Sequence, residues 1–272
     1  MSNEDDLQEP LFEKMSASPA PEPSERPSKK RKRGEVEQGA KKAAKKAKSK
    51  KAKDNEDEDL DLEAGINRAF SHMDNQLLAD YVARQTKRHE SDLSAIELED
   101  KYLPATAIRD TTSWEKPRTL GNLPGFLEKF AGNSTKLWGS SKKNGAPHTI
   151  IVCASGLRAS EVARAMRSLV TKDSSVAKLF AKHIKIKDSI TFLKSKRTGI
   201  AVGTPTRLKD LMDDGALQVD RLERIVIDAS HIDMKKRGIL EMRETQVPLT
   251  VWLGQKEFME KYASGGIQLL FY

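Results

Sequence analysis

Four short segments that can bind phosphate or a metal–nucleotide complex follow apolar runs in this 272-residue sequence. In the first two, at residues 154–158 and 203–207, a serine or threonine precedes an arginine at the expected start of a helix. The first N–H groups of a helix bind phosphate, and an arginine adds charge-assisted hydrogen bonds. In the third, at residues 228–231, an acid ends an apolar run, as when a buried strand delivers a carboxylate to a nucleotide site. The fourth is the Leu-Gly-Gln of residues 253–255.

The first two segments are candidate RNA-binding turns. Thr204 can cap the helix that Pro205 begins, because Thr accepts hydrogen bonds at the N-cap and Pro fits the first helical position. Arg158 and Arg207 are expected to lie side by side with both guanidinium groups aimed at phosphates. The alternative is that both segments are ordinary capped turns and that Arg207 is a surface arginine. The candidate residues are Ser155, Gly156, Arg158, Thr204, Pro205, Thr206 and Arg207.

The third segment, Asp228-Ala229-Ser230-His231, looks like a nucleotide-site motif that has lost its chemistry. Asp228 is interpreted as a residue that caps the following turn rather than as a metal ligand, because no second acid is fixed near it. Ala229 has only a methyl group and cannot act as a general base. His231 is interpreted as a satisfied surface histidine rather than a catalytic one.

The parts needed for nucleotide hydrolysis are missing from the sequence. It contains no G-x-x-x-x-G-K-[ST] loop to hold phosphates and magnesium. The nearest imitation, WGSSKKNGAPHT at residues 138–149, has the wrong order and precedes a strand rather than a helix. Cys153 is the single cysteine, so no disulfide framework or Cys/His zinc spacing is possible. No catalytic residue, metal or cofactor is expected.

The alternation of apolar runs and helical patterns predicts one α/β domain. Continuous apolar strands separated by helices are typical of a parallel sheet covered on both faces. We therefore expect a single doubly wound, RecA-like parallel-sheet lobe over residues 121–272. The predicted strands are 148–155, 183–187, 199–203, 225–227, 249–253 and 266–272. The predicted helices are 123–130, 162–170, 190–193 and 206–212, the last closed by Gly215.

Three segments precede the lobe. Residues 1–59 are expected to be a disordered tail, because they combine few large apolar residues with blocks of like charge. Residues 60–90 are predicted to form one amphipathic helix, with apolar residues spaced by three or four at Leu62, Ile66, Phe70, Met73, Leu77 and Tyr81. This stripe can dock on the lobe or in a partner's groove. Residues 91–120 are expected to be an extended linker packed on the lobe.

The tail carries two basic clusters that favour nuclear and nucleolar targeting, with RNA contact as a second role. The alternative is a solvated tail with no specific role. The whole chain has a formal net charge of +8 and a pI of about 9.3, which favours polyanionic partners. No secretory signal and no apolar run of about 18 residues is found, so no membrane partner is expected. The cluster residues are Lys29, Lys30, Arg31, Lys32, Arg33, Lys41, Lys42, Lys45 and Lys46.

The order of the four segments resembles that in the N-terminal RecA-like lobe of DEAD-box RNA helicases, over residues 110–258. In this resemblance, residues 154–158 fall where those enzymes have Pro-Thr-Arg-Glu-Leu-Ala, and residues 203–207 resemble their Thr-Pro-Gly-Arg. Residues 228–231 replace Asp-Glu-Ala-Asp, and residues 253–255 replace Ser-Ala-Thr. The sequence has no counterpart of the second helicase lobe.

The chain is also similar to the Cms-type nucleolar proteins, subunits of the small-subunit processome, over residues 60–272. LSAIELEDKYLP, DTTSW, NLPGFLEKF, VGTPTRLKDLM and VIDASHID carry the resemblance. It implies a non-catalytic ribosome-biogenesis factor whose partners are pre-ribosomal RNA and particle proteins, with no small-molecule substrate. The alternatives are an RNA-dependent ATPase that acts with a partner in trans, and a nuclear protein that acts on DNA.

Overall fold

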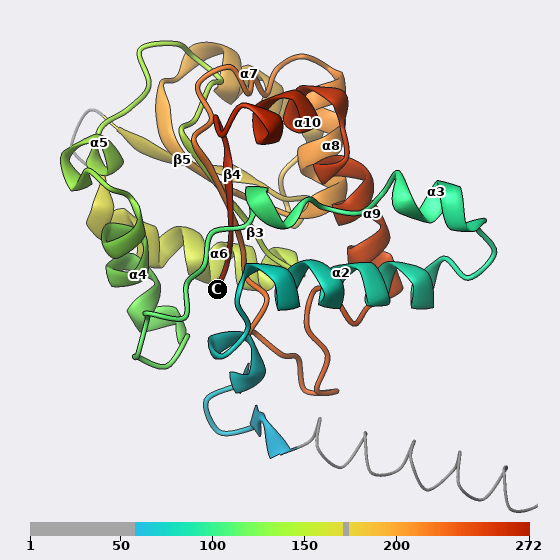
Figure 1. Cartoon of the computed structure of the whole chain (residues 1–272). Coiled ribbons are helices and arrows are strands. Elements are labelled where there is room, and N and C mark those ends of the chain that lie inside the picture. The colour runs from blue at the N-terminus through green and yellow to red at the C-terminus, as the bar shows by residue number, and fades with distance from the viewer. Residues whose placement is uncertain (1–57, 171–173) are drawn as a thin grey trace, which may run out of the picture. The chain divides into compact units, whose positions relative to one another are not determined.

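The computed structural model describes residues 58–170 and 174–272. Both basic clusters of the tail lie outside these residues. The described residues belong to one compact unit of the chain, which contains a five-stranded, all-parallel sheet in the order β4-β5-β3-β6-β7 (Figure 1). The α/β class with a doubly wound parallel sheet is confirmed. The strands are β3 (Thr149–Val152), β4 (Ser175–Leu179), β5 (Thr198–Gly203), β6 (Arg224–Ile227) and β7 (Gln268–Phe271).

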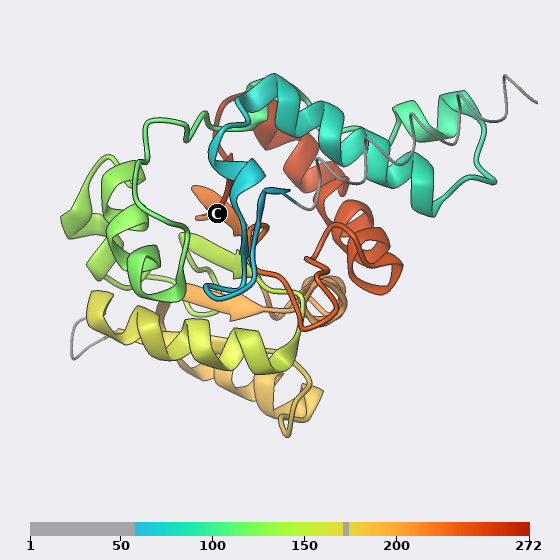
Figure 2. The same ribbon diagram turned by 90° about the horizontal axis from the view of Figure 1, so that it is seen from below.

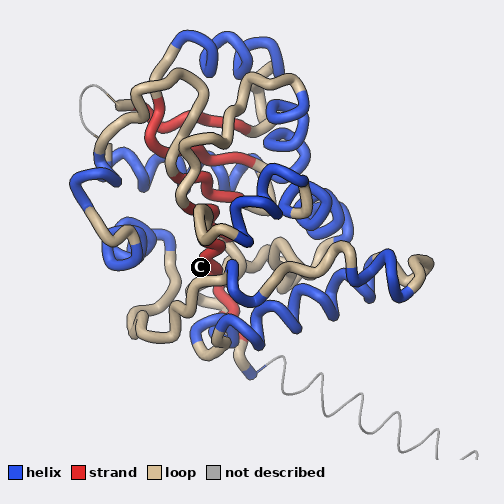
Figure 3. The backbone as a smooth tube through the Cα atoms, turned by 45° about the horizontal axis from the view of Figure 1, so that its top comes forward, coloured by secondary structure: helices blue, strands red, loops and turns tan. Residues whose placement is uncertain are grey.

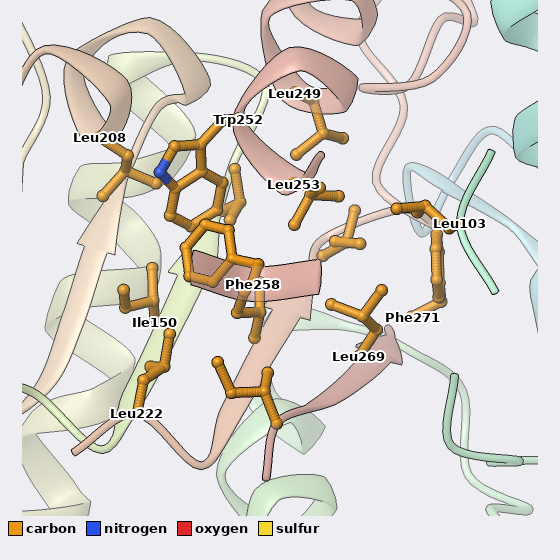
Figure 4. Packing of buried hydrophobic residues seen from close by; sticks show 14 of the residues in the cluster. Leu103, Ile150, Leu208, Leu222, Leu249, Trp252, Leu253, Phe258, Leu269 and Phe271 are labelled. Atoms are coloured by element: carbon orange, nitrogen blue, oxygen red, sulfur yellow. The ribbon is translucent and has the colours of Figure 1, made fainter. Parts of the chain in front are cut away.

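Apolar side chains alternate between the two faces of the sheet, and helices cover both faces. Ile150 and Ile225 point into one core, whereas Ile151 and Val226 point into the other. The first core is packed by α2 and α7–α10, with Trp252 and Phe258 in edge-to-face contact (Figure 4). The second core is packed by α4–α6. These helices are α2 (Asn75–His89), α4 (Leu123–Phe130), α5 (Ser134–Trp138), α6 (Gly156–Ala165), α7 (Ile186–Ser195), α8 (Pro205–Asp213), α9 (Arg243–Leu253) and α10 (Lys256–Ala263).

Residues 60–90 do not form the single helix that the apolar spacing predicts. A short antiparallel pair, β1 (Leu60–Asp61) and β2 (Ile66–Asn67), leads into the 3-10 helix η1 (Arg68–Ser71). Helix α2 begins only after Asp74, whose carboxylate accepts a hydrogen bond from the backbone N–H of Leu77 (2.8 Å). The helix buries Leu78, Ala79 and Val82 against the lobe, so the stripe is displaced from the predicted one.

The connection between α2 and the lobe contains short helices and a bridge to the sheet. It includes α3 (Ala95–Glu99), with a capping box between Ser94 and Glu97, and two 3-10 helices, η2 (Ala105–Ala107) and η3 (Leu120–Asn122). Helices α2 and α3 extend away from the strands (Figure 3). Ile108 forms an isolated parallel bridge with Leu269 of β7. The chain therefore touches the open edge of the sheet before it reaches α4.

Two predicted strands are wrong. Residues 183–185 lie in the turn that leads into α7, residues 186–187 begin this helix, and the strand lies earlier, at Ser175–Leu179. Residues 249–253, rich in residues that favour strands, end helix α9. Leu249, Trp252 and Leu253 are buried at helical spacing while Val251 is exposed, so packing of one helical face overrides the local preference. The predicted strands at 148–155, 199–203, 225–227 and 266–272 are confirmed in their central residues, and the helices at 123–130, 190–193 and 206–212 are confirmed. The helix predicted at 162–170 is confirmed only in part, because α6 ends at Ala165 and a 3-10 helix follows at Met166–Leu169.

Candidate nucleic-acid interface

Three of the four predicted segments meet at the carboxyl edge of the sheet. Strands β5, β3 and β6 are neighbours, and Val152 is in register with both Gly203 and Ile227. The residues after these three strands therefore lie next to one another, as parallel strands require. The fourth segment, residues 253–255, lies at the end of α9, so its predicted place at a strand end is wrong. Strand β7 is the neighbour of β6, and Tyr272 follows it.

Arg158 and Asp228 form a buried ion pair across this edge. Arg158 donates from Nε to Oδ2 (2.7 Å) and from Nη2 to Oδ1 (3.2 Å) of Asp228. The side chains are only 7% and 1% exposed. Burial lowers the pKa of Arg158, but the Asp228 carboxylate raises it by more, so the pKa lies above its usual value. The expectation that Arg158 points outward to phosphate is wrong, because its guanidinium ties α6 to the end of β6.

Arg207 is also held within the protein. Its Nη1 and Nη2 donate to the carbonyl oxygen of Ile184 at 3.1 and 3.2 Å, and Nη1 lies 3.4 Å from Ser189 Oγ. Half-buried, it fastens the turn between β4 and α7 to the start of α8. The two arginines thus position the carboxyl edge, and they are not a pair of free guanidinium groups.

The helix starts beside these arginines differ in their capping. Ser155 caps α6, since its Oγ accepts from the backbone N–H of Arg158 (3.2 Å). Thr204 occupies the N-cap position of α8 without a side-chain cap, and Pro205 is the first helical residue. Ser155 and Thr206 are exposed. Both helices therefore present their first turns at one edge, although the predicted hydroxyl cap of Thr204 is absent.

The segment after β6 is covered by the N-terminal strands. The Asn67 N–H donates to Ser230 O (2.7 Å), the Ile232 N–H donates to Gly65 O (3.0 Å), and Ile66 bridges His231. Figures 1 and 2 place this blue segment beside the chain that follows β6. Asp228, Ala229 and Ser230 are buried, and His231 is half-buried with a pKa lowered by burial. Asp228 does not cap the turn as expected, because both of its oxygens bind Arg158.

Arg118 fills the corner between Ile108 and the end of β7. The chain that leaves Ile108, which bridges Leu269 of β7, continues toward α4. There Arg118, 1% exposed, donates from Nη2 to Thr111 Oγ1 (3.0 Å) and from Nη1 to Phe271 O. Burial lowers its pKa to about 10. The buried cation therefore ties residue Thr111 to the end of β7.

The exposed positive charge at the carboxyl edge comes from a segment that was predicted to be a strand. Lys182, His183 and Lys185 are exposed between β4 and α7, Lys187 is exposed in the first turn of α7, and we call residues 182–187 the lysine loop. A Cβ atom added at Gly156 would lie 2.9 Å from the Lys182 Cβ, so the loop packs against the start of α6. The signal was present in the sequence as three lysines within six residues, directly after a short apolar run.

Within the described ranges, no three His, Cys, Asp or Glu side chains gather as metal ligands. None of the helices in residues 58–170 and 174–272 has the length and apolar character needed to cross a bilayer. The parallel sheet, its strand order and the helices on both of its faces define a doubly wound α/β lobe.

Comparison with known protein families identifies the family to which this chain belongs. The profile of the CMS1 family, described as a U3-containing 90S pre-ribosomal complex subunit, matches residues 24–272, and the chain belongs to this family. The resemblance to Cms-type proteins is thereby confirmed.

Two relatives are similar to this chain over most of its length. Protein CMS1 of Chaetomium thermophilum is 57% identical over 219 residues, which cover 80% of this chain and 87% of the relative. Protein cms1 of Schizosaccharomyces pombe is 32% identical, covering 72% and 69% of the two chains. A crystal structure of a DEAD box protein from Methanococcus jannaschii is 21% identical, with a TM-score of 0.31, covering 48% of this chain and 32% of that chain.

Proposed function

We propose that this chain is a non-catalytic ribosome-biogenesis factor of the small-subunit processome and that its lobe binds pre-ribosomal RNA at the carboxyl edge. The lysine loop supplies the charge, and the first turns of α6 and α8 supply backbone N–H groups. Arg158 and Arg207 hold these parts in place. The observation that carries the proposal is the packing of the exposed lysine loop against the start of α6.

Three features support a binding role over catalysis. The sequence has no G-x-x-x-x-G-K-[ST] loop, both Asp228 oxygens bind Arg158, and Ala229 offers no base. The family's description as a pre-ribosomal complex subunit agrees with this role. The tail clusters at residues 29–33 and 41–46 are proposed to direct the chain to the nucleolus, where pre-ribosomal particles assemble.

The test compares two matched pairs of charge reversals in the full-length chain. Lys182→Glu with Lys185→Glu alters the lysine loop, whereas Arg164→Glu with Arg167→Glu alters one exposed cation in the last turn of α6 and one just after it. RNA affinity is measured at several salt concentrations. Each lost phosphate contact should reduce the slope of log affinity against log salt by about 0.7 for single strands, so the first variant should lose about 1.4.

The control variant should keep the wild-type slope, because the tail contributes equally to both proteins. Equal slopes for the two variants would show that the carboxyl edge does not bind RNA. RNA-stimulated ATP hydrolysis that resists a contamination control would instead support the alternative of an ATPase acting with a partner in trans.

A further inference from the structure

The amino edge of the sheet, opposite the proposed RNA site, carries a second concentration of positive charge. Because the strands are parallel, the segments before β3, β5 and β6 gather at this edge. Six exposed cations lie on these segments, and we call them together the amino-edge surface. They are Lys136, Lys142, Lys194, Lys196, Arg197 and Arg221.

The acidic residues near this surface already form ion pairs with other residues. Asp220 pairs with Lys143 (3.1 Å), and Glu223 pairs with the buried Arg224 (2.7 Å). The six amino-edge cations form no ion pair with any residue in the described parts of the chain. The surface therefore keeps a local excess of six positive charges, which a polyanion can neutralise.

Hydrogen bonds tie the three cationic segments together. Asn144 Nδ2 donates to Lys194 O (3.0 Å), which links the segment before β3 to the one before β5. The Gln218 N–H donates to Gly145 O (2.7 Å), which links it to the segment before β6. His148 Nε2 lies 3.2 Å from Gly139 O, and burial lowers the pKa of this histidine. These hydrogen bonds hold together the three segments that carry the cations.

Two hollows open on this surface, and one of them has an aromatic ring in its wall. One, of about 460 Å³, is lined by Lys136, Lys142 and Arg221 among others, and Trp138 is the residue directly before Gly139 in its wall. The other, of about 430 Å³, is lined by Phe192 together with Lys196 and Arg197. Trp138 is 39% exposed, whereas Trp114 and Trp252 are 8% and 0% exposed.

Cations combined with an accessible aromatic ring favour single-stranded RNA over an acidic protein. Lysine and arginine neutralise backbone phosphates, and an exposed ring offers a face on which a base stacks. An acidic peptide would pair with the positive charges, but it would give no role to the exposed indole ring of Trp138. We propose that the amino-edge surface is a second RNA-binding site, in which the six cations contact phosphates and a base stacks on Trp138.

Two sites on one lobe allow it to hold two RNA segments at once. The six residues of β5 span about 20 Å at the usual rise of a strand, and this length separates the two edges. A short single strand bound at one edge therefore leaves the other free. This bridging role rests on the proposed function at the carboxyl edge, whereas binding at the amino edge does not.

The test uses the tryptophan fluorescence of the full-length chain, titrated with a 12-nucleotide oligouridylate. The two buried tryptophans give a constant background, so saturable quenching reports stacking on Trp138. Trp138→Leu should abolish the quenching. Lys142→Glu with Arg197→Glu and Arg221→Glu should raise the midpoint of quenching at least tenfold, with an unchanged melting temperature. Lys182→Glu with Lys185→Glu should leave the midpoint unchanged.

The possible outcomes separate this inference from the proposed function. RNA binding without quenching, or quenching that only the lysine-loop variant removes, overturns the amino-edge site. A polyglutamate peptide that quenches at the same concentration as the RNA overturns it in favour of an acidic protein partner. Quenching that depends on the amino-edge cations supports the amino-edge site. If the lysine-loop variant also keeps the wild-type salt slope of RNA affinity, the proposed site at the carboxyl edge is contradicted.

Discussion

Replacing Arg158 by alanine should unfold this protein more readily rather than simply weaken RNA binding. The change leaves the Asp228 carboxylate, 1% exposed, without the two hydrogen bonds of 2.7 and 3.2 Å that Arg158 donates. A carboxylate in such a place has neither water nor a counter-charge. The nearest other charge on α6, Glu161, has the same sign and approaches Arg158 at 3.8 Å.

The expected loss in the free energy of unfolding is about 3–5 kcal/mol, the usual cost of removing one partner from a buried pair. For a chain of this size, each kcal/mol lowers the melting temperature by about 2–4 °C, so a decrease on the order of 10 °C is expected. If Arg158 were an exposed arginine, the loss would be about half a kcal/mol. The two accounts differ by several times the error of the measurement.

Urea unfolding followed by circular dichroism measures this difference. Arg164→Ala is the matched control on the same helix, because Arg164 is exposed, and it should stay within about 0.5 kcal/mol of wild type. Arg158→Met combined with Asp228→Leu should recover most of the stability, since it removes both buried charges. An Arg158→Ala variant with wild-type stability and weakened RNA binding would refute the buried pair.

Three further predictions address other parts of the chain. Arg207→Ala should lower the free energy of unfolding by about 1 kcal/mol and speed hydrogen exchange in the lysine loop, because it frees the carbonyl that anchors this loop. Deleting residues 1–51 should leave the melting temperature unchanged, whereas deleting residues 1–67 should lower it by removing β1 and β2; equal melting temperatures would contradict this. Burial lowers the pKa of both His148 and His231 below the ordinary 6.5, so the unfolded chain binds more protons near that pH. Stability should therefore fall as the pH drops from 7 through 6.5 toward the folded-state values, and replacing both histidines by glutamine should flatten this decline.

Much of the sheet and of its carboxyl edge was predictable from the sequence. Strands buried on both faces consist of continuous apolar residues, and this signal is present at residues 150–152, 200–202 and 225–227. Since such strands run parallel, the turns after them had to meet at one edge. The meeting of Ser155, Thr204 and Asp228 followed from these two facts alone.

Local preference failed where a segment's partner decided its structure. Residues 249–253 have the composition of a strand, yet Trp252 packs as part of a helix against Phe258. The strand that pairs with β6 is instead β7, which begins about forty residues after β6 ends. Likewise, the spacing of Leu62, Ile66 and Phe70 fits a helix, but Ile66 pairs with His231 in an extended conformation.

The sequence by itself determined the class of fold, the position of the strand ends and the excess of positive charge, because these follow from local composition and periodicity. Only the tertiary structure decided which charges are available. Arg158 meets an acid 70 residues away and Arg207 a carbonyl oxygen 23 residues away, so both are bound, while lysines beside them remain exposed. A charge is neutralised by what lies next to it in space, and the order in which the strands assemble sets those neighbours.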